Sequence, residues 1–100
     1  MAVVSVSPWQ INNRDDAQRI ARDLAPRLRQ HGAQAVHIGR ITTGQHTGQT
    51  ILSVRYENFE TLGKALAQAA QDQQYHQQIE EIRKVGQIHE RNIIVLEELN

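Results

Sequence analysis

The stretch Gln49-Thr-Ile-Leu-Ser-Val-Arg-Tyr-Glu57 decides the fold of this chain. Read with a period of two residues, it divides its side chains between two faces: Leu52, Val54 and Tyr56 on one, and Ile51, Ser53 and Arg55 on the other. Such alternation is typical of a strand whose two faces meet different surroundings. The first face is apolar enough to belong to a core. The second face is mixed, and an arginine in an interior strand needs water, a ligand or a partner molecule to cover it.

Three more segments have β character. Residues 34–41 alternate in the same way, and the loop 42–49 that follows holds two glycines and no large apolar side chain. This loop predicts a hairpin between residues 34–41 and the opening stretch. Residues 2–7 are predicted to form a first strand, which ends at Pro8. Residues 87–99 are predicted to form one long last strand.

Two helical regions alternate with these strands. In the first, Asn12 or Asn13 is a suitable N-cap, and apolar side chains recur at helical spacing: Ala17, Ile20, Ala21, Leu24, Ala25 and Leu28. Pro26 falls inside this helix, so a kink or a restart is expected there. The second region begins with Asn58 as its N-cap, and Asp72 caps a further helical piece.

The order of these elements is β-α-β-β-α-β, which is the ferredoxin-like split βαβ arrangement. In this α+β fold a four-stranded antiparallel sheet carries both helices on one face, and residues 1–100 form a single domain. The other face is bare, and we expect these apolar residues on it: Val3, Ile51, Ile93 or Val95, and Trp9. Because such a face is too apolar to leave in water, the pattern predicts a homodimer that pairs two sheets through the open face.

Charge and composition restrict the classes of partner. The 100 residues include 11 basic and 11 acidic side chains, so nothing favours a nucleic-acid backbone or an anionic membrane as partner. The chain has no cysteine, which removes disulfides and thiolate metal sites. The longest apolar run, Ile93-Ile-Val-Leu96, is too short to span a bilayer, and residues 1–8 lack the features of a signal peptide. The expected location is the cytoplasm.

Four segments carry a resemblance to a known superfamily: Gly44-Gln-His-Thr-Gly48, Ile51-Leu-Ser-Val-Arg-Tyr56, Asn58-Phe-Glu-Thr-Leu-Gly-Lys-Ala65 and Gly86-Gln-Ile-His-Glu-Arg-Asn-Ile-Ile94. They resemble the dimeric α+β barrel proteins, which include antibiotic-biosynthesis-type monooxygenases, EthD-like proteins, NIPSNAP-like proteins and many uncharacterised bacterial domains. The resemblance implies two sheets that close into a barrel across a homodimer, with a pocket between each sheet and its helices or inside the barrel. The haem-degrading branch uses an Asn, Trp and His set that does not match this chain, so no cofactor is expected.

His37 and Arg55 are the predicted catalytic pair. If their face lines the barrel, they converge with four predicted ligand-binding residues: Ser53 of the same hairpin, and Ser5, Ser7 and Trp9 of the neighbouring strand. A neutral imidazole acts as a general base at neutral pH, and a guanidinium holds a carboxylate or an enolate oxygen. The alternative is structural, with Arg55 paired to a glutamate such as Glu90 across the dimer and His37 merely packed.

The histidines give no metal-binding pattern. They are His31, His37, His46, His76 and His89, and no two lie four residues apart on one predicted helix. Without cysteine or a His-Glu-x-x-His spacing, no metal site is predicted.

These residues favour a homodimeric α+β barrel protein that binds a small organic molecule. Two alternatives stay open. One is a cofactor-independent enzyme of the monooxygenase, cyclase or isomerase type, acting on a small organic or aromatic substrate. The other is a structural dimer without a ligand. A pocket that receives both His37 and Arg55 would favour the enzyme, and a cavity without them would favour binding.

Overall fold

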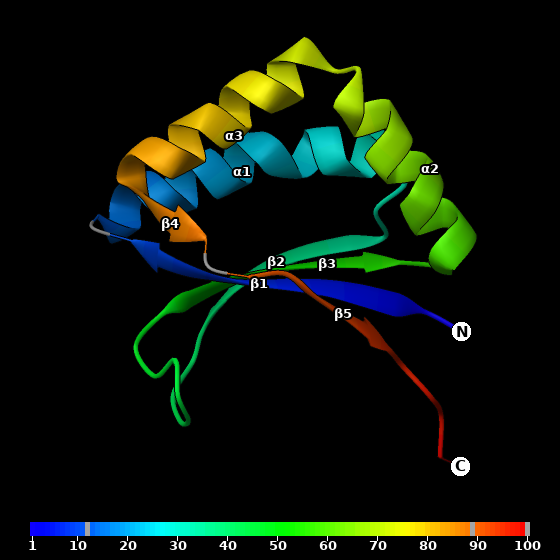
Figure 1. Ribbon diagram of the computed structural model, residues 1–100, viewed down its shortest axis with the longest axis horizontal. Coiled ribbons are helices and arrows are strands. Elements are labelled where there is room, and N and C mark those ends of the chain that lie inside the picture. The colour runs from blue at the N-terminus through cyan, green and yellow to red at the C-terminus, as the bar shows by residue number, and fades with distance from the viewer. Residues whose placement is uncertain (12, 89, 100) are drawn as a thin grey trace.

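The strands and helices follow the predicted order in the computed structural model, which describes residues 1–11, 13–88 and 90–99. The elements are β1 (Val3–Ile11), α1 (Arg14–Gln30), β2 (Ala35–Arg40), β3 (Thr50–Tyr56), α2 (Phe59–Ala70), α3 (Gln73–Val85), β4 (Gly86–Ile88) and β5 (Asn92–Val95). The helices lie together on one side of the sheet, and the chain after β5 runs away from them (Figure 1). This arrangement confirms the predicted ferredoxin-like α+β fold.

The sheet is antiparallel, and β1 is its central strand. The order is β2-β3-β1-β4, and β5 also pairs with β1. Along one edge β1 pairs with β3 from Val3 to Trp9, whereas its other edge is shared between β5 at Val3–Val6 and β4 at Trp9–Ile11. The β2–β3 hairpin is confirmed, and Gly44 and Gly48 take positive φ angles of 97° and 91° in its loop.

The prediction of one long last strand is wrong, because two short strands replace it. Ile88 lies opposite Trp9, and Asn92 lies opposite Val6. From Ile88 to Asn92 the chain advances four residues (92 − 88), while β1 advances only three (9 − 6). The extra residue ends the ladder of β4 and restarts it as β5 with the opposite parity.

The pairing register decides which residues share a face. Val3, Ser5, Ser7 and Trp9 lie opposite Tyr56, Val54, Leu52 and Thr50, and these eight form the helix-facing face. Val3 and Trp9 are 0% and 1% exposed, so the expectation that they lie on the bare face is wrong. The helices cover the face of β1 that carries Val3 and Trp9 and leave its other face uncovered. Ile51 does lie on the opposite face of the sheet, which we call the open face. Ile93 and Val95, in contrast, lie opposite Ser5 and Val3 and point to the same side of the sheet as these two residues.

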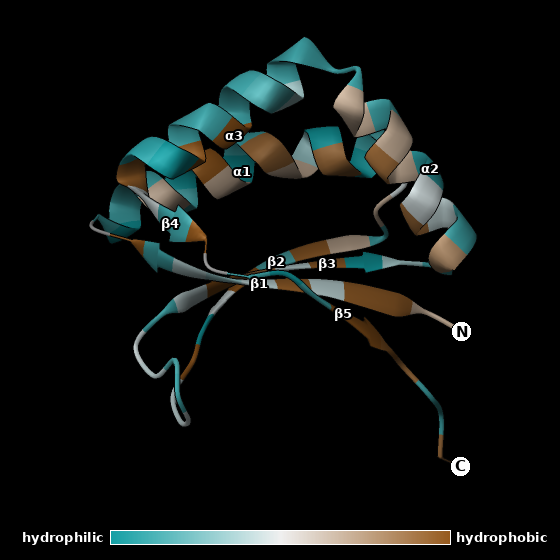
Figure 2. Ribbon diagram, in the orientation of Figure 1, coloured by the Kyte–Doolittle hydropathy of each residue, from teal (hydrophilic) through white to brown (hydrophobic). Residues whose placement is uncertain are grey.

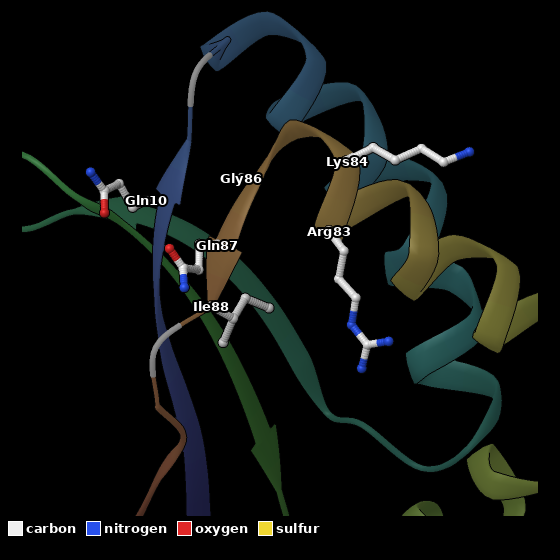
Figure 3. Close-up of a pocket in the computed structure, with 6 residues that line it drawn as sticks. All are labelled: Gln10, Arg83, Lys84, Gly86, Gln87 and Ile88. Carbon is white, nitrogen blue, oxygen red and sulfur yellow. The ribbon is translucent and has the colours of Figure 1, made fainter.

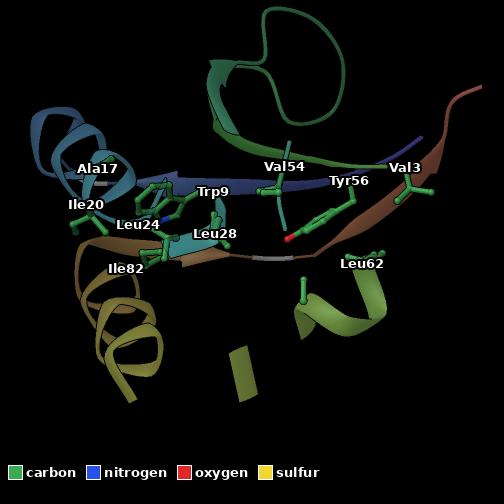
Figure 4. Close-up of a cluster of buried hydrophobic side chains, with 12 residues drawn as sticks. Val3, Trp9, Ala17, Ile20, Leu24, Leu28, Val54, Tyr56, Leu62 and Ile82 are labelled. Atoms are coloured by element: carbon green, nitrogen blue, oxygen red, sulfur yellow. The ribbon is translucent and has the colours of Figure 1, made fainter. Parts of the chain in front are cut away.

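The core fills the space between the helix-facing face and α1, α2 and α3. The largest fully buried side chains are Trp9, Ile20, Leu24, Ile82 and Val3. Figure 4 shows them pointing into the space between the strands and the helices. Hydrophilic residues cover much of α3, while β5 and the first part of β1 are hydrophobic (Figure 2). The residues of β5 stay exposed on both faces, because the three described helices lie away from this edge of the sheet (Figure 1).

Side-chain caps begin the helices as predicted. Asn13 accepts the backbone N–H of Asp16 at 3.2 Å, and Asn58 accepts that of Thr61 at 2.8 Å. Asn12, the other cap that the sequence allows, is outside the described residues. A restart at Pro26 is not found, because α1 runs from Arg14 to Gln30 without interruption. Pro26 is exposed, so water can satisfy the carbonyl group that its missing N–H leaves without a partner.

Gly86 ends α3 and begins β4 at a point where the backbone passes close to β1. A Cβ atom on Gly86 would stand 2.4 Å from the backbone oxygen of Gln10 and 2.6 Å from Nε1 of Trp9. Both distances are far below van der Waals contact, so this position accepts only glycine without a backbone shift. The buried Nε1 of Trp9 has no hydrogen-bond partner within the described ranges.

Candidate functional site

A cavity of about 70 Å³ lies between the sheet and the helices. Its floor is the helix-facing face, with these residues: Ser5, Ser7, Leu52, Val54 and Tyr56. Its roof comes from all three helices: Leu24, Leu28, Leu62, Leu66, Tyr75, Ile79 and Ile82. Ile88 and Arg91 complete the lining and are both exposed, so the cavity meets solvent beside them. We call this space the helix-side cavity.

Five polar side chains interrupt the apolar lining of the helix-side cavity: Ser5, Ser7, Tyr56, Tyr75 and Arg91. None of the five makes a side-chain hydrogen bond or an ion pair to another residue in the ranges 1–11, 13–88 and 90–99. Buried polar groups in folded proteins usually have partners. These hydroxyl and guanidinium groups are therefore available to a bound molecule or to water.

The phenol of Tyr56 stays protonated at neutral pH. Burial raises its pKa above the ordinary value of 10.0, and nearby Tyr75 raises it further, while the positive charge of Arg91 opposes the rise. Tyr56 is therefore a hydrogen-bond donor at the cavity floor.

The structure divides the six sequence-predicted site residues between the two faces of the sheet. Ser5 and Ser7 line the helix-side cavity, and Trp9 shares their face but is packed in the core away from it. The other three lie on the open face: His37, Ser53 and Arg55. The expected convergence of all six residues is therefore not found within one chain.

On the open face, the two hairpin strands do bring the predicted catalytic pair together. His37 lies directly opposite Ser53, and Arg55 lies opposite Ala35, so His37 and Arg55 are diagonal neighbours on one face. Both side chains are exposed. Arg55 borders an open hollow of about 540 Å³ that Glu97 and Glu98 also line.

The suggested partner of Arg55 across a dimer, Glu90, has a partner in its own chain. His46 Nε2 in the hairpin loop lies 3.1 Å from Glu90 Oε1. Arg55 forms no ion pair with any described residue. His89 is outside the described residues.

A second hollow, of about 500 Å³, lies at the outer edge of β4 (Figure 3). Gln10, Arg83, Lys84 and Gln87 line it, together with Gly86 and Ile88. Figure 3 shows the Lys84 side chain extending away from Gln10 and Gln87, and Arg83 is held by Glu80 at 2.7 Å. Because these cations do not converge, this hollow is a weaker candidate than the helix-side cavity.

A polar cluster joins the end of α1 to the corner between α2 and α3. His31 Nε2 lies 2.9 Å from Asp72 Oδ2, and Arg27 Nη1 lies 3.1 Å from the same oxygen. The other carboxylate oxygen of Asp72 caps α3 by accepting the N–H groups of Gln74 and Tyr75. The hydrogen bond from His31, ahead of those from Tyr75 and Arg27, lowers the pKa of Asp72 to about 2. Every polar atom of this carboxylate serves the fold, so we assign the cluster a structural role.

Within the described ranges, no three His, Asp or Glu side chains gather closely enough to hold a metal ion. No helix in the same ranges is long and apolar enough to cross a bilayer.

The predicted site residues leave out three of the five polar side chains of the helix-side cavity: Tyr56, Tyr75 and Arg91. Tyr75 was recognisable only as part of an apolar helix stripe with Ile79 and Ile82. Arg91 lies in the short connection between β4 and β5, where no periodic pattern assigns a direction to its side chain. The pairing of residues distant in the sequence brings both to Ser5 and Ser7.

Residues 3–95 match the family described as Domain of unknown function (DUF6854). No curated protein sequence matches the chain. Among the solved structures that share its fold are the following three. SnoaB from Streptomyces nogalater, a cofactor-independent oxygenase, has a TM-score of 0.75 at 10% identity, over 98% of this chain and 95% of that chain. Rv0793 from Mycobacterium tuberculosis has a TM-score of 0.64 at 13% identity, over 100% and 97%. A NIPSNAP family protein from Agrobacterium tumefaciens has a TM-score of 0.63 at 13% identity, over 95% and 92%.

At these identities the similarity concerns the fold alone. It confirms the predicted resemblance of architecture to a NIPSNAP family protein and to a cofactor-independent oxygenase.

Proposed function

The chain belongs to the DUF6854 family, and we propose that it is a homodimeric protein that binds a small organic molecule in the helix-side cavity. One observation carries this proposal: an otherwise apolar cavity holds five polar side chains whose polar groups have no side-chain hydrogen bond or ion pair among the described residues. Ligand sites typically combine apolar walls with a few polar groups that fix orientation. The volume of about 70 Å³ suits a very small molecule, since a cavity known to bind benzene measures about 150 Å³.

The open face supports the homodimer part of the proposal. Val4, Val6 and Ile51 lie on it beside Ile94, which is 44% exposed. Apolar residues gathered on one sheet face favour association, and a second copy provides a self-complementary surface.

Titration of the protein with butan-1-ol, followed by the NMR chemical shifts of its backbone amides, tests the binding function. We expect saturable shifts in β1, β3 and α2, around the helix-side cavity. Ser7→Leu places a larger side chain in the cavity and should abolish these shifts. Ser53→Leu makes the same chemical change on the open face and should preserve them. Shifts that do not saturate, or that survive in Ser7→Leu, would reject the proposal in favour of a structural dimer.

Sedimentation of the protein tests the homodimer. Val6→Glu places a carboxylate on the open face, where a paired sheet would bury it, so this variant should sediment as a single chain. Gln77→Glu adds the same charge at an exposed position of α3 and should leave the dimer intact. A wild-type protein that sediments as a single chain at micromolar concentration would remove the dimer from the proposal.

A second candidate function is a cofactor-independent enzyme of the monooxygenase, cyclase or isomerase type at the open face. The observation that favours it is the diagonal placement of His37 and Arg55, with Ser53 directly opposite His37. There His37 would act as the general base and Arg55 would hold the anion. Exchange of the central C–H protons of pentane-2,4-dione for deuterium measures such proton abstraction. It should be lost in His37→Gln and retained in Ser7→Leu; equal exchange in wild type and His37→Gln would reject the enzyme.

A further inference from the structure

Arg91 is the one lining residue of the helix-side cavity, among those the structure describes, that is charged at neutral pH. The other described lining residues are Leu, Ile and Val side chains, two serines and two tyrosines. We propose that the cavity binds a short-chain monocarboxylate, with its carboxylate against Arg91 and its hydrocarbon part between β1, β3 and the helices. This inference rests on the proposed function, because it names the ligand class for the same cavity.

Within the described ranges, no acidic side chain neutralises the charge of Arg91. Arg27 and Arg83 both bind carboxylates of their own chain, whereas Arg91 forms no ion pair within the described ranges. Its exposure places it where the cavity meets solvent. Its positive charge opposes the rise in the pKa of Tyr56, so its field reaches the buried floor. An unpaired cation beside apolar walls attracts an anion more strongly than the same cation in water.

The remaining polar groups match the hydrogen-bonding capacity of a carboxylate. Tyr56 is protonated and donates its O–H, and Ser5 and Ser7 carry hydroxyls that donate equally well. A carboxylate only accepts hydrogen bonds, so it complements donors alone. An ammonium ion only donates and would be repelled by Arg91.

The cavity volume limits the hydrocarbon part. A volume of about 70 Å³ corresponds to about two water molecules of the liquid, or roughly three carbon atoms. Apolar side chains from three helices, including Leu28, Leu62 and Ile79, surround this space. The three-carbon hydrocarbon part of butanoate matches this volume, and its carboxylate would lie beside the single guanidinium, where the cavity meets solvent.

Parallel NMR titrations with butanoate, butan-1-ol and n-butylammonium test this ligand class. We expect butanoate to bind about tenfold more tightly than butan-1-ol, since a hydrogen bond to a charged group typically contributes this much. Arg91→Gln should weaken butanoate binding about tenfold without changing the affinity for butan-1-ol. Arg91→Lys keeps the charge and should restore part of the loss. Arg22→Gln removes a charge from α1 outside the cavity and should have no effect.

The outcomes separate this inference from the proposed function. Butanoate and butan-1-ol binding equally well, or butanoate affinity unchanged in Arg91→Gln, would overturn the ligand class while the binding function stands. Butanoate that still binds to Ser7→Leu would be held outside the cavity, which also overturns the inference. If neither butanoate nor butan-1-ol gives saturable shifts, the proposed function itself fails.

Discussion

The helix-facing and open faces of the sheet use the same strands but surround their polar residues differently. On the helix-facing face, Ser5, Ser7 and Tyr56 lie under three helices, where water is scarce, so a hydroxyl without a partner there favours a bound molecule that can pair with it. On the open face of a single chain, His37 and Arg55 are exposed to solvent, where unpaired polar groups cost little. The difference shows that residue type alone does not mark a site. A serine inside an enclosed apolar space is stronger evidence of a ligand than an exposed histidine.

The largest expected effect concerns the packing that closes the helix-facing face. Gly86→Ala should lower the free energy of unfolding by about 3 kcal/mol, because the added Cβ overlaps the Gln10 backbone and the Trp9 indole. Gly63→Ala is the matched control: nothing lies within 4 Å of the added Cβ, and in the interior of α2 it should stabilise the protein by about 0.8 kcal/mol. Urea unfolding measures both changes, and equal effects would mean that β4 does not pack closely on β1.

A pair of adjacent residues on β3 compares the two faces directly. Val54 is 6% exposed on the helix-facing face, and Val54→Ala should cost about 2 kcal/mol through lost burial and a new cavity. Ser53→Ala, one residue away on the open face, should change stability by less than about 0.5 kcal/mol. The urea midpoints of the two variants measure these changes in stability. A larger loss of stability for Ser53→Ala than for Val54→Ala would reverse the assignment of the two faces.

Asp72 tests how firmly the helix layer is held above the sheet. Its folded-state pKa is about 2 against an ordinary 3.8, so its stabilising effect is complete above pH 3.8 and disappears as the pH falls toward 2. Asp72→Asn should therefore lower the melting temperature at neutral pH, and the gap to wild type should close across that window. Glu81→Gln, at an exposed position of α3, is the control and should show no such convergence. A constant gap down to pH 2 would contradict the assigned role of Asp72.

The smallest effect at neutral pH is expected for Tyr56→Phe. The hydroxyl has no partner among the described residues, so its removal should change stability by less than about 0.5 kcal/mol. Above pH 10.0 the unfolded state loses the phenolic proton more readily than the folded state, because the folded pKa is raised. Wild type should then lose stability as the pH rises, and Tyr56→Phe should lose less. Equal losses would show that the phenol at the cavity floor is accessible to water.

Strand alternation predicted which residues of one strand share a face, and these predictions hold. Ser5, Ser7 and Trp9 do lie together, as do Ser53 and Arg55. Alternation does not predict which faces of two paired strands coincide, because a change of pairing register by one residue moves every side chain of a strand to the other face of the sheet. His37 was matched correctly to Ser53, since a short hairpin loop joins their strands. Ser5 is paired with β3 only through contacts distant in the sequence, and the prediction that Ser5 shares a face with His37 and Ser53 is wrong.

The helices were predictable because their caps and apolar spacing are local. Asn13, Asn58 and Asp72 cap α1, α2 and α3 as the sequence indicates. The helix-side cavity was not predictable, because it is defined by the space that side chains of six elements leave between them. No local pattern contains that information.

The one-residue offset between β4 and β5 decides which side chains of the last strand point toward the helices. If the register of β4 continued unchanged through residues 92–95, Ile94 would lie opposite Val3 and Ile93 opposite Val4. The offset instead places Ile93 opposite Ser5 and Ile94 opposite Val4. A backbone irregularity of one residue, rather than the identity of any β5 side chain, thus selects what each surface of the sheet's rim presents.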